Sequence, residues 1–404
     1  MLFGFWAALL VTIFQDLPFD NTLAEWRDHP AIQYHTAATH DPIAELQRSI
    51  KSGKVVLKKS GSSGYLDSLL KALDIPISSQ IAVFARDSVQ SRRINETNPR
   101  TLFFNDSVVV GWVGGGFIEI ASQDPTQGAI FYTLDRNLLG PAEIKRDDTC
   151  LQCHHTYASV GIPGMLVRSS GQFIVDHRVP LDQRWGGWYV TGQHGSLKHL
   201  GNVAIGKLFQ GAVPPSSQNL KSLAGKFTNP SSYLSVHSDI VALMVFEHQM
   251  QMMNLLTRIG WEARVQEVEK TEISLQDAAA QVVDYLLFVD EAPLNNRISG
   301  STSFATEFVG LGPKDRIGRS LRDFDLEDRL MRFPCSYMVY SKQFDSLPAK
   351  AKDAIHHRMW DVLSGKVRGP RYRKLSVIDR LAIVEILRDT KPDLPAYFQT
   401  AAVK

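Results

Sequence analysis

The sequence predicts an α+β protein with a β-rich N-terminal half, a middle segment that holds most of the reactive residues, and an α-helical C-terminal half. Short runs rich in Val, Ile, Phe and Tyr fill residues 81–134, as in antiparallel strands. Pro and Ser gather in residues 211–232, and helical periodicity dominates residues 233–404. Because 404 residues exceed what one hydrophobic core normally holds, we expect about two domains, or one with large insertions.

The composition is that of an ordinary globular protein. Hydrophobic residues make up 44%, which excludes wholesale disorder. The 44 Lys and Arg residues nearly balance the 42 Asp and Glu residues, leaving a formal net charge of +2. So small a charge provides no overall field to hold nucleic acid, and no basic cluster with interleaved aromatic residues stands out. We therefore expect no nucleic-acid partner.

Residues 1–16 form an apolar N-terminal segment. Its run Leu2–Phe14 is too short to span a membrane but has the length of a signal-peptide core. No Lys or Arg precedes Arg27, and no Ala-x-Ala cleavage site follows the run, so the signal is atypical. We expect an export signal, with a buried first helix or strand as the alternative. No transmembrane span is expected in the mature protein.

Residues 17–140 are expected to form a β-rich domain. A helix with apolar spacing is predicted over Tyr65–Leu73 and is closed by Pro76. Gly- and Asn-containing turns then separate short apolar runs, a pattern typical of hairpins. The predicted strands are Ile81–Phe84, Thr101–Phe104, Val108–Val113, Phe117–Ala121 and Ala129–Leu134.

The next segment, residues 141–210, contains the sequence Cys150-Leu151-Gln152-Cys153-His154, which is the C-x-x-C-H signature of covalent haem c attachment. Two thiols one helical turn apart can each add to a vinyl group of one porphyrin, and the following His is the proximal iron ligand. A chain of this composition would contain the pattern by chance roughly 0.0007 times, so accident is a poor explanation. We predict one covalent haem on Cys150 and Cys153, with His154 bound to the iron.

Other uses of the two cysteines remain open. A zinc site would need a second Cys or His pair, and Cys335 stands alone. A redox dithiol would follow a strand in a βαβ unit, which the pattern lacks, and a Cys150–Cys153 disulfide would be strained. Cys335 itself is predicted to be an inert, buried thiol.

The chain resembles the c-type cytochromes through residues 150–154 and the downstream Gly161-Ile162-Pro163-Gly164. In its length it resembles the large bacterial members of that family that have a single haem. The resemblance implies a cytochrome c-like helix at the motif. It also implies haem attachment outside the cytoplasmic membrane, and hence a periplasmic or otherwise extracytoplasmic protein. The strands and the C-terminal helices are not part of the small cytochrome fold.

The sixth iron ligand is a Met or His in such proteins. His199 and His194 lie in a Gly-containing loop, Met165 follows the Gly161–Gly164 sequence, and His248 lies on a predicted helix. We rank His199 first, then Met165, His194 and His248, while each also has an ordinary structural explanation. Five-coordinate iron is a further possibility.

Basic and aromatic residues that follow the motif are candidates for contacts with the porphyrin. The aromatic and glycine cluster 184–189 is expected either to pack on the ring or to form an ordinary hairpin. Arg168, Arg178 and Arg184 are candidates to pair with the haem propionates.

The C-terminal half is separated by a predicted linker at residues 211–232, and the helices of residues 233–404 are expected to complete the haem domain. The strongest helix is Ser238–Ile259, with Ser235 or Ser238 as the cap and Gly260 just past the end. Further helices are predicted at Leu275–Val289, Ala349–Ser364 and Val377–Asp389.

Two functions follow from these predictions. The first is electron transfer by an exported c-type haem protein, with a redox partner protein. The second is a haem enzyme, peroxidase-like or another oxidoreductase, in which the additional chain builds a pocket for a small-molecule substrate over an open iron. A zinc-binding structural module is a distant third. The sequence identifies neither the partner nor the substrate, and it indicates no catalytic residues.

Overall fold

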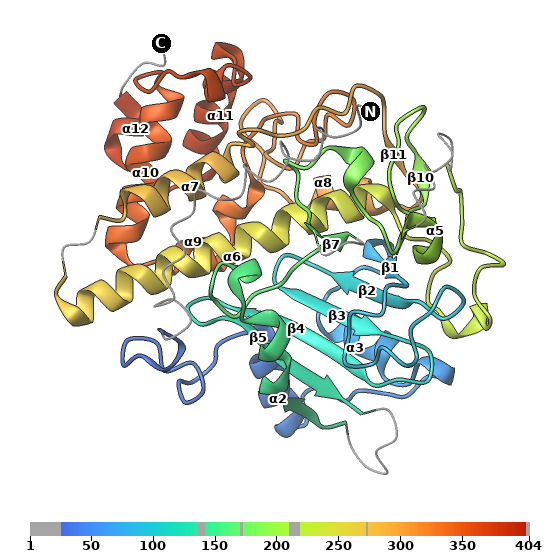
Figure 1. Cartoon of the computed structure of the whole chain (residues 1–404). Coiled ribbons are helices and arrows are strands. Elements are labelled where there is room, and N and C mark those ends of the chain that lie inside the picture. Colours follow the sequence, from blue (N-terminus) through green and yellow to red (C-terminus); the bar gives the residue numbers. More distant parts are fainter. Residues whose placement is uncertain (1–25, 136–141, 170–172, 210–218, 272–273, 401–404) are drawn as a thin grey trace, which may run out of the picture.

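The computed structural model describes residues 26–135, 142–169, 173–209, 219–271 and 274–400 (Figure 1). The predicted export segment 1–16 lies outside the described residues, as do residues 210–218 at the predicted linker. The predicted α+β class is confirmed, since an antiparallel sheet dominates the N-terminal half and helices dominate the C-terminal half.

The main sheet has seven strands in the order β6-β5-β4-β3-β2-β1-β9, and every neighbouring pair is antiparallel. All five predicted strands are present, and two short strands that the sequence did not reveal extend the two edges. The strands are β1 (Ile81–Val83), β2 (Arg100–Phe104), β3 (Val108–Trp112), β4 (Ile118–Asp124), β5 (Gly128–Leu134), β6 (Ile144–Arg146) and β9 (Trp188–Tyr189). Two-stranded ribbons join β7 (Arg168–Ser169) to β8 (Phe173–Ile174) and β10 (Gly192–Gln193) to β11 (Ser299–Gly300).

Helices cover both faces of this sheet. On one face, the Tyr132 hydroxyl of β5 donates to Asp41 at 2.8 Å, and Asp41 is the cap of α2 (Pro42–Lys51). On the other face, Gln123 of β4 donates to the hydroxyl of Thr257 in α6 (Ile240–Glu269) at 3.2 Å. Gln123 pairs with Ala129 across the ladder, so its side chain projects away from the Tyr132 face.

The central helix α6 crosses the molecule between the sheet and the C-terminal helices (Figure 1). It is longer than predicted and begins elsewhere. Asp239 caps it by accepting from the backbone N–H groups of Val241 and Ala242 at 2.8 and 3.1 Å. Gly260 does not end the helix, and it lies in close packing, since a Cβ there would lie 3.3 Å from Leu347. The helix continues to Glu269.

Helices of the C-terminal half pack against α6, and one continuous hydrophobic core joins them to the sheet. The predicted helices at 65–73, 275–289, 349–364 and 377–389 are all present with shifted ends. The remaining helices are α3 (Leu66–Ala72), α4 (Leu151–His154), α5 (Ile205–Phe209), α7 (Gln276–Leu286), α8 (Phe304–Gly310), α9 (Lys342–Asp345), α10 (Ala349–Leu363), α11 (Val377–Thr390) and α12 (Ala396–Thr400). Within the described part of the chain, no helix is both long and apolar enough to cross a membrane.

Candidate haem-attachment site

The motif occupies a short helical segment that follows β6. A 3-10 turn over Asp148–Cys150 runs directly into α4, and Asp147 caps the turn by accepting from the Thr149 N–H at 3.1 Å. Cys150 and Cys153 are three positions apart on this segment, which sets them on the same side of one helical turn. A short helical segment with an acidic cap is therefore present at the motif.

Bonds to distant segments hold this turn in position. The Asp147 N–H donates to the carbonyl of Phe131 in β5 at 2.9 Å. The Asp148 carboxylate accepts from Arg146 Nε at 2.8 Å and lies 2.7 Å from His35 Nδ1. The motif is thus fixed to the edge of the sheet.

Both thiols of the motif are free and lie toward the surface. Cys153 is exposed and Cys150 is half-buried. Burial, assisted by the nearby carboxylates of Asp147 and Glu119, raises the pKa of Cys150 to about 12. Cys150 is therefore a neutral thiol at neutral pH.

The His154 ring has one engaged and one free nitrogen. Nδ1 lies 2.9 Å from the carbonyl oxygen of Gly164, and the Phe131 ring packs against the imidazole with centroids 4.8 Å apart. Burial lowers the pKa of His154, although the bond to Gly164 opposes this shift. A neutral imidazole that donates from Nδ1 keeps its lone pair on Nε2, the arrangement that a metal-bound histidine requires. No residue in the described part of the chain bonds to Nε2.

The neighbouring His155 differs from His154. Its Nε2 lies 3.0 Å from the carbonyl oxygen of Gly161, and its backbone forms an isolated bridge with Pro163. His155 therefore fastens the loop after the motif.

That loop is held by α6 through a residue that the sequence analysis missed. Asn254 accepts from the Met165 N–H at 3.1 Å and donates to the Met165 carbonyl at 2.8 Å. Gly164 lies so close to it that a Cβ there would come within 2.2 Å of the Asn254 amide oxygen. Asn254 thereby positions the carbonyl that bonds to His154. Its only signal in the sequence is a polar residue within an apolar helix.

Charged residues lie beside the motif on the α6 face of the sheet. Arg100 of β2 pairs with Glu119 of β4 at 3.0 Å, and the buried Nε of Arg100 has no hydrogen-bond partner. Both residues act electrostatically on His154, as does Arg168. Arg100 is a further candidate to pair with a propionate, although no motif in the sequence marks it.

The other two predicted propionate partners already bond to carboxylates. Arg178 pairs with Asp176 at 2.6 Å. Arg184 is fully buried and pairs with Glu247 of α6, which also accepts from Trp185 Nε1 at 2.9 Å. The beginning of the aromatic cluster 184–189 is thus tied to α6.

Among the sixth-ligand candidates, His248 is enclosed within the core. Its Nε2 lies 2.8 Å from the Ser336 hydroxyl, and its Nδ1 lies 2.9 Å from Nδ1 of His177. Phe288 stacks on the ring with centroids 4.4 Å apart. Both nitrogens are engaged, so ligation by His248 would require these bonds to break.

Met165 is buried and directly follows Gly164. The Gly164 carbonyl bonds to Nδ1 of His154, on the side of the ring away from the free Nε2. The backbone of Met165 therefore lies on the proximal side of the candidate site.

His194 and His199 form a pair in the loop after β10. Their ring centroids are 4.7 Å apart, and Trp185 lies 5.5 Å from His199. Among the described residues, none forms a well-aligned hydrogen bond with either ring nitrogen of His199. Burial lowers its pKa to about 3, although the nearby Gly201 backbone opposes this shift. His199 thus has ring nitrogens that no described residue engages through a well-aligned hydrogen bond. Its ring packs against Trp185 and His194, whereas the His154 ring packs against Phe131, so the described ring contacts do not join the two histidines.

Cys335 is fully buried, as predicted, and burial raises its pKa to about 12. Across the described residues, no group of three or more His, Cys, Asp or Glu side chains is arranged to hold a metal ion. Thus a closed zinc site around Cys150 and Cys153 has no further ligands among those residues.

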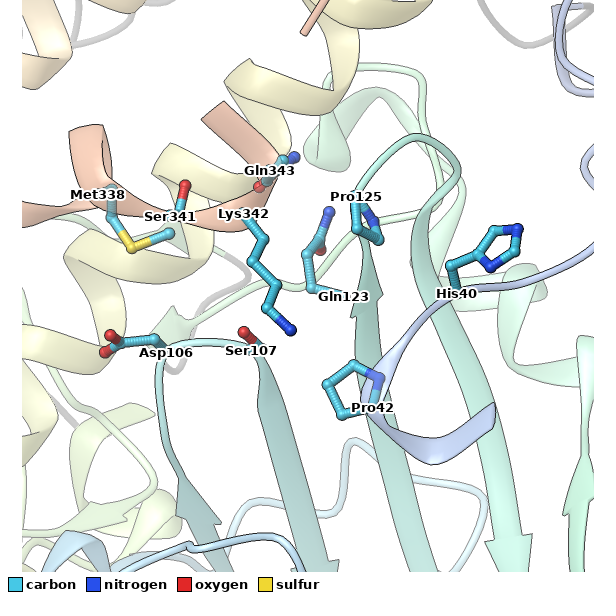
Figure 2. Close-up of a pocket in the computed structure, with 10 residues that line it drawn as sticks. All are labelled: His40, Pro42, Asp106, Ser107, Gln123, Pro125, Met338, Ser341, Lys342 and Gln343. Carbon is cyan, nitrogen blue, oxygen red and sulfur yellow. The ribbon is translucent and has the colours of Figure 1, made fainter. Parts of the chain in front are cut away.

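A small cavity lies elsewhere, where α9 meets the turns of the sheet (Figure 2). Lys342 reaches toward Ser107, and His40 and Pro42 lie on the opposite wall. Its volume of about 20 Å³ suits a single water molecule. No residue of the motif lines it.

The free thiols and the free Nε2 fit the attachment of a haem. Residues 150–154 supply one ligand nitrogen and two thiols on one turn, and Asn254 and Gly164 fix the orientation of the imidazole. Comparisons with protein-family models, with curated proteins and with solved structures found no match to this chain.

Proposed function

We propose that the chain is an exported c-type haem protein with an electron-transfer function. One haem would be attached through Cys150 and Cys153, with His154 as the proximal iron ligand. The observation that carries this proposal is the bond between His154 Nδ1 and the Gly164 carbonyl, which leaves Nε2 free directly after two free thiols. The location implied is periplasmic or otherwise extracytoplasmic.

A bound haem would supply an iron that exchanges one electron between the ferrous and ferric states. The residues of the chain do the rest. Gly164 holds the proton on Nδ1 of His154, and Asn254 holds Gly164 in position through the Met165 backbone. Arg100 and Arg168 provide positive charge beside the imidazole.

The second candidate function is a haem enzyme with an open iron site. It is favoured by the positions of the sixth-ligand candidates: His248 is fully engaged, and Met165 lies on the proximal side. His199 is the strongest candidate that remains for a closed coordination sphere, because no described residue meets either of its ring nitrogens with a well-formed hydrogen bond.

Visible spectroscopy of the protein made with a cytochrome maturation system tests these proposals. Electron transfer predicts a low-spin ferric spectrum and little binding of carbon monoxide, and His199→Ala should convert the iron to high spin if His199 is the ligand. A high-spin protein that binds carbon monoxide quickly and turns over peroxide would establish the enzyme instead.

Variants of the adjacent histidines provide a matched control. His154→Gln should change the spectrum, because the iron loses its proximal ligand. His155→Gln should leave the spectrum nearly unchanged, because the His155 ring bonds to the Gly161 carbonyl and to no other described residue. Equal spectral effects of the two variants would contradict the proposed role of His154.

A further inference from the structure

A larger cavity of about 330 Å³ lies between the turn that follows α7 and the segment that precedes α11. This volume is typical of the smaller pockets that bind organic ligands. Exposed residues, among them Pro293 and Asp328, line its mouth and open it to the surface. The apolar part of the wall consists of Leu287, Phe288, Val289, Pro293, Pro334 and Leu375, and about half of the lining residues are polar or charged.

A buried carboxylate forms part of this wall. Glu291 is 8% exposed, and its Oε1 accepts from the Leu330 N–H at 2.8 Å. No described residue donates to its second oxygen. This oxygen is not fully enclosed, and a carboxylate oxygen that is open to the cavity can accept from a donor on a ligand.

The basic side chains around the cavity form their described hydrogen bonds with acceptors other than the Glu291 carboxylate. Arg329 bonds to Asp379, Arg371 to Asp284 and Asp290, and Lys374 to the backbone carbonyl of Glu291. In contrast, no described residue bonds to the carboxylate of Asp328, which also lines the cavity. The carboxylates of Glu291 and Asp328 therefore keep oxygens that no described residue engages, and these oxygens can accept a hydrogen bond from a ligand.

We propose that this cavity binds a small organic cation, a primary amine with an apolar body, whose ammonium group pairs with the Glu291 carboxylate. The apolar wall would take up the body of the amine, and Asp328 would attract its charge at the mouth. This site is separate from the motif, since none of residues 150–154 lines the cavity.

The charges that face Glu291 make such binding dependent on pH. Burial raises the pKa of Glu291 to about 7. The hydrogen bond from the Leu330 N–H and the positive charges of Arg184, Arg329 and Lys374 act in the opposite direction and lower it. The ammonium group would pair with the ionised carboxylate and so displace its proton. Affinity should consequently rise as the pH increases from about 6 to about 8.

Titration of the full-length chain with three ligands of one shape tests the proposal by calorimetry. Cyclohexylamine should bind saturably, cyclohexanol should bind about tenfold more weakly, and cyclohexanecarboxylate should not bind. Glu291→Gln, which keeps the acceptor for Leu330, should weaken amine binding about tenfold. Glu327→Gln, on an exposed residue outside the cavity, should leave it unchanged.

Asp328→Asn provides a second variant that does not alter the core. It should weaken amine binding about threefold through the loss of charge at the mouth. The proposal is overturned if the amine does not bind, if the alcohol binds equally well or the carboxylate binds more tightly, or if a folded Glu291→Gln variant binds the amine like the wild type. If Glu291→Gln does not fold, unchanged amine binding by Asp328→Asn overturns the proposal.

Discussion

His154 and His248 both lie on helices, yet their rings are used in opposite ways. His248 engages both nitrogens with Ser336 and His177, whereas His154 engages only Nδ1. Around His248, Glu247 likewise bonds to Arg184 and Trp185. The difference indicates that the middle of α6 uses its polar groups for stability, and that the motif keeps a lone pair available for a ligand.

The largest expected effect comes from the ion pair next to His248. Glu247→Ala should lower the free energy of unfolding by about 3–5 kcal/mol, because it leaves the buried Arg184 charge unpaired. Denaturant unfolding measures the change. Asp67→Ala, which breaks the exposed Asp67–Lys71 pair of α3, should cost at most about 0.5 kcal/mol. Equal losses in the two variants would contradict the contrast between the regions.

The next effect is a dependence of stability on pH. Burial lowers the pKa of His248 to about 3, against an unfolded value of 6.5. Below pH 6.5, His248 is therefore protonated in the unfolded chain but stays neutral in the folded chain. The stability from neutral His248 is fully present above pH 6.5, and it is lost toward pH 3 by about 1.4 kcal/mol per pH unit.

His248→Gln should flatten this slope between about pH 6 and 4, as measured by denaturant unfolding at each pH. His357→Gln serves as the control, because His357 is exposed. Parallel slopes for the wild type and His248→Gln would show that the folded protein accepts a charge on His248.

The smallest effect concerns the support of the motif. Asn254→Ala should destabilise the fold by about 1–3 kcal/mol, because the Met165 N–H and carbonyl lose their partner. In the haem-loaded protein it should also shift the reduction potential, because Gly164 would hold the proton on His154 less firmly. A destabilised variant with an unchanged potential would assign Asn254 a purely structural role.

Local patterns in the sequence sufficed for much of the fold. The five predicted strands are rich in Val, Ile and Phe, and they form the centre of the sheet. The edge strands β6 and β9 have three and two residues, which is too short for a periodic pattern to emerge. The extent of α6 was wrong because Gly260 signals an end locally, whereas packing against Leu347 decides its role.

The candidate site was predictable only in part, for a similar reason. Cys150, Cys153 and His154 are contiguous and form a motif. Arg100 and Asn254, in contrast, reach the site from β2 and α6, and only the tertiary structure brings them there. Cys335 needed no tertiary information, because an isolated cysteine in an apolar run is usually a buried thiol.

The most direct test of the central claim is the intact mass of the purified chain after expression with a cytochrome maturation system. We predict a mass one haem above that of the polypeptide, and this added mass should remain after acid-acetone extraction. The Cys335→Ala variant should have the same added mass. We predict reduced attachment in Cys150→Ala or Cys153→Ala and none in the double variant. A chain with the mass of the bare polypeptide, from a host that loads other cytochromes, would contradict the account.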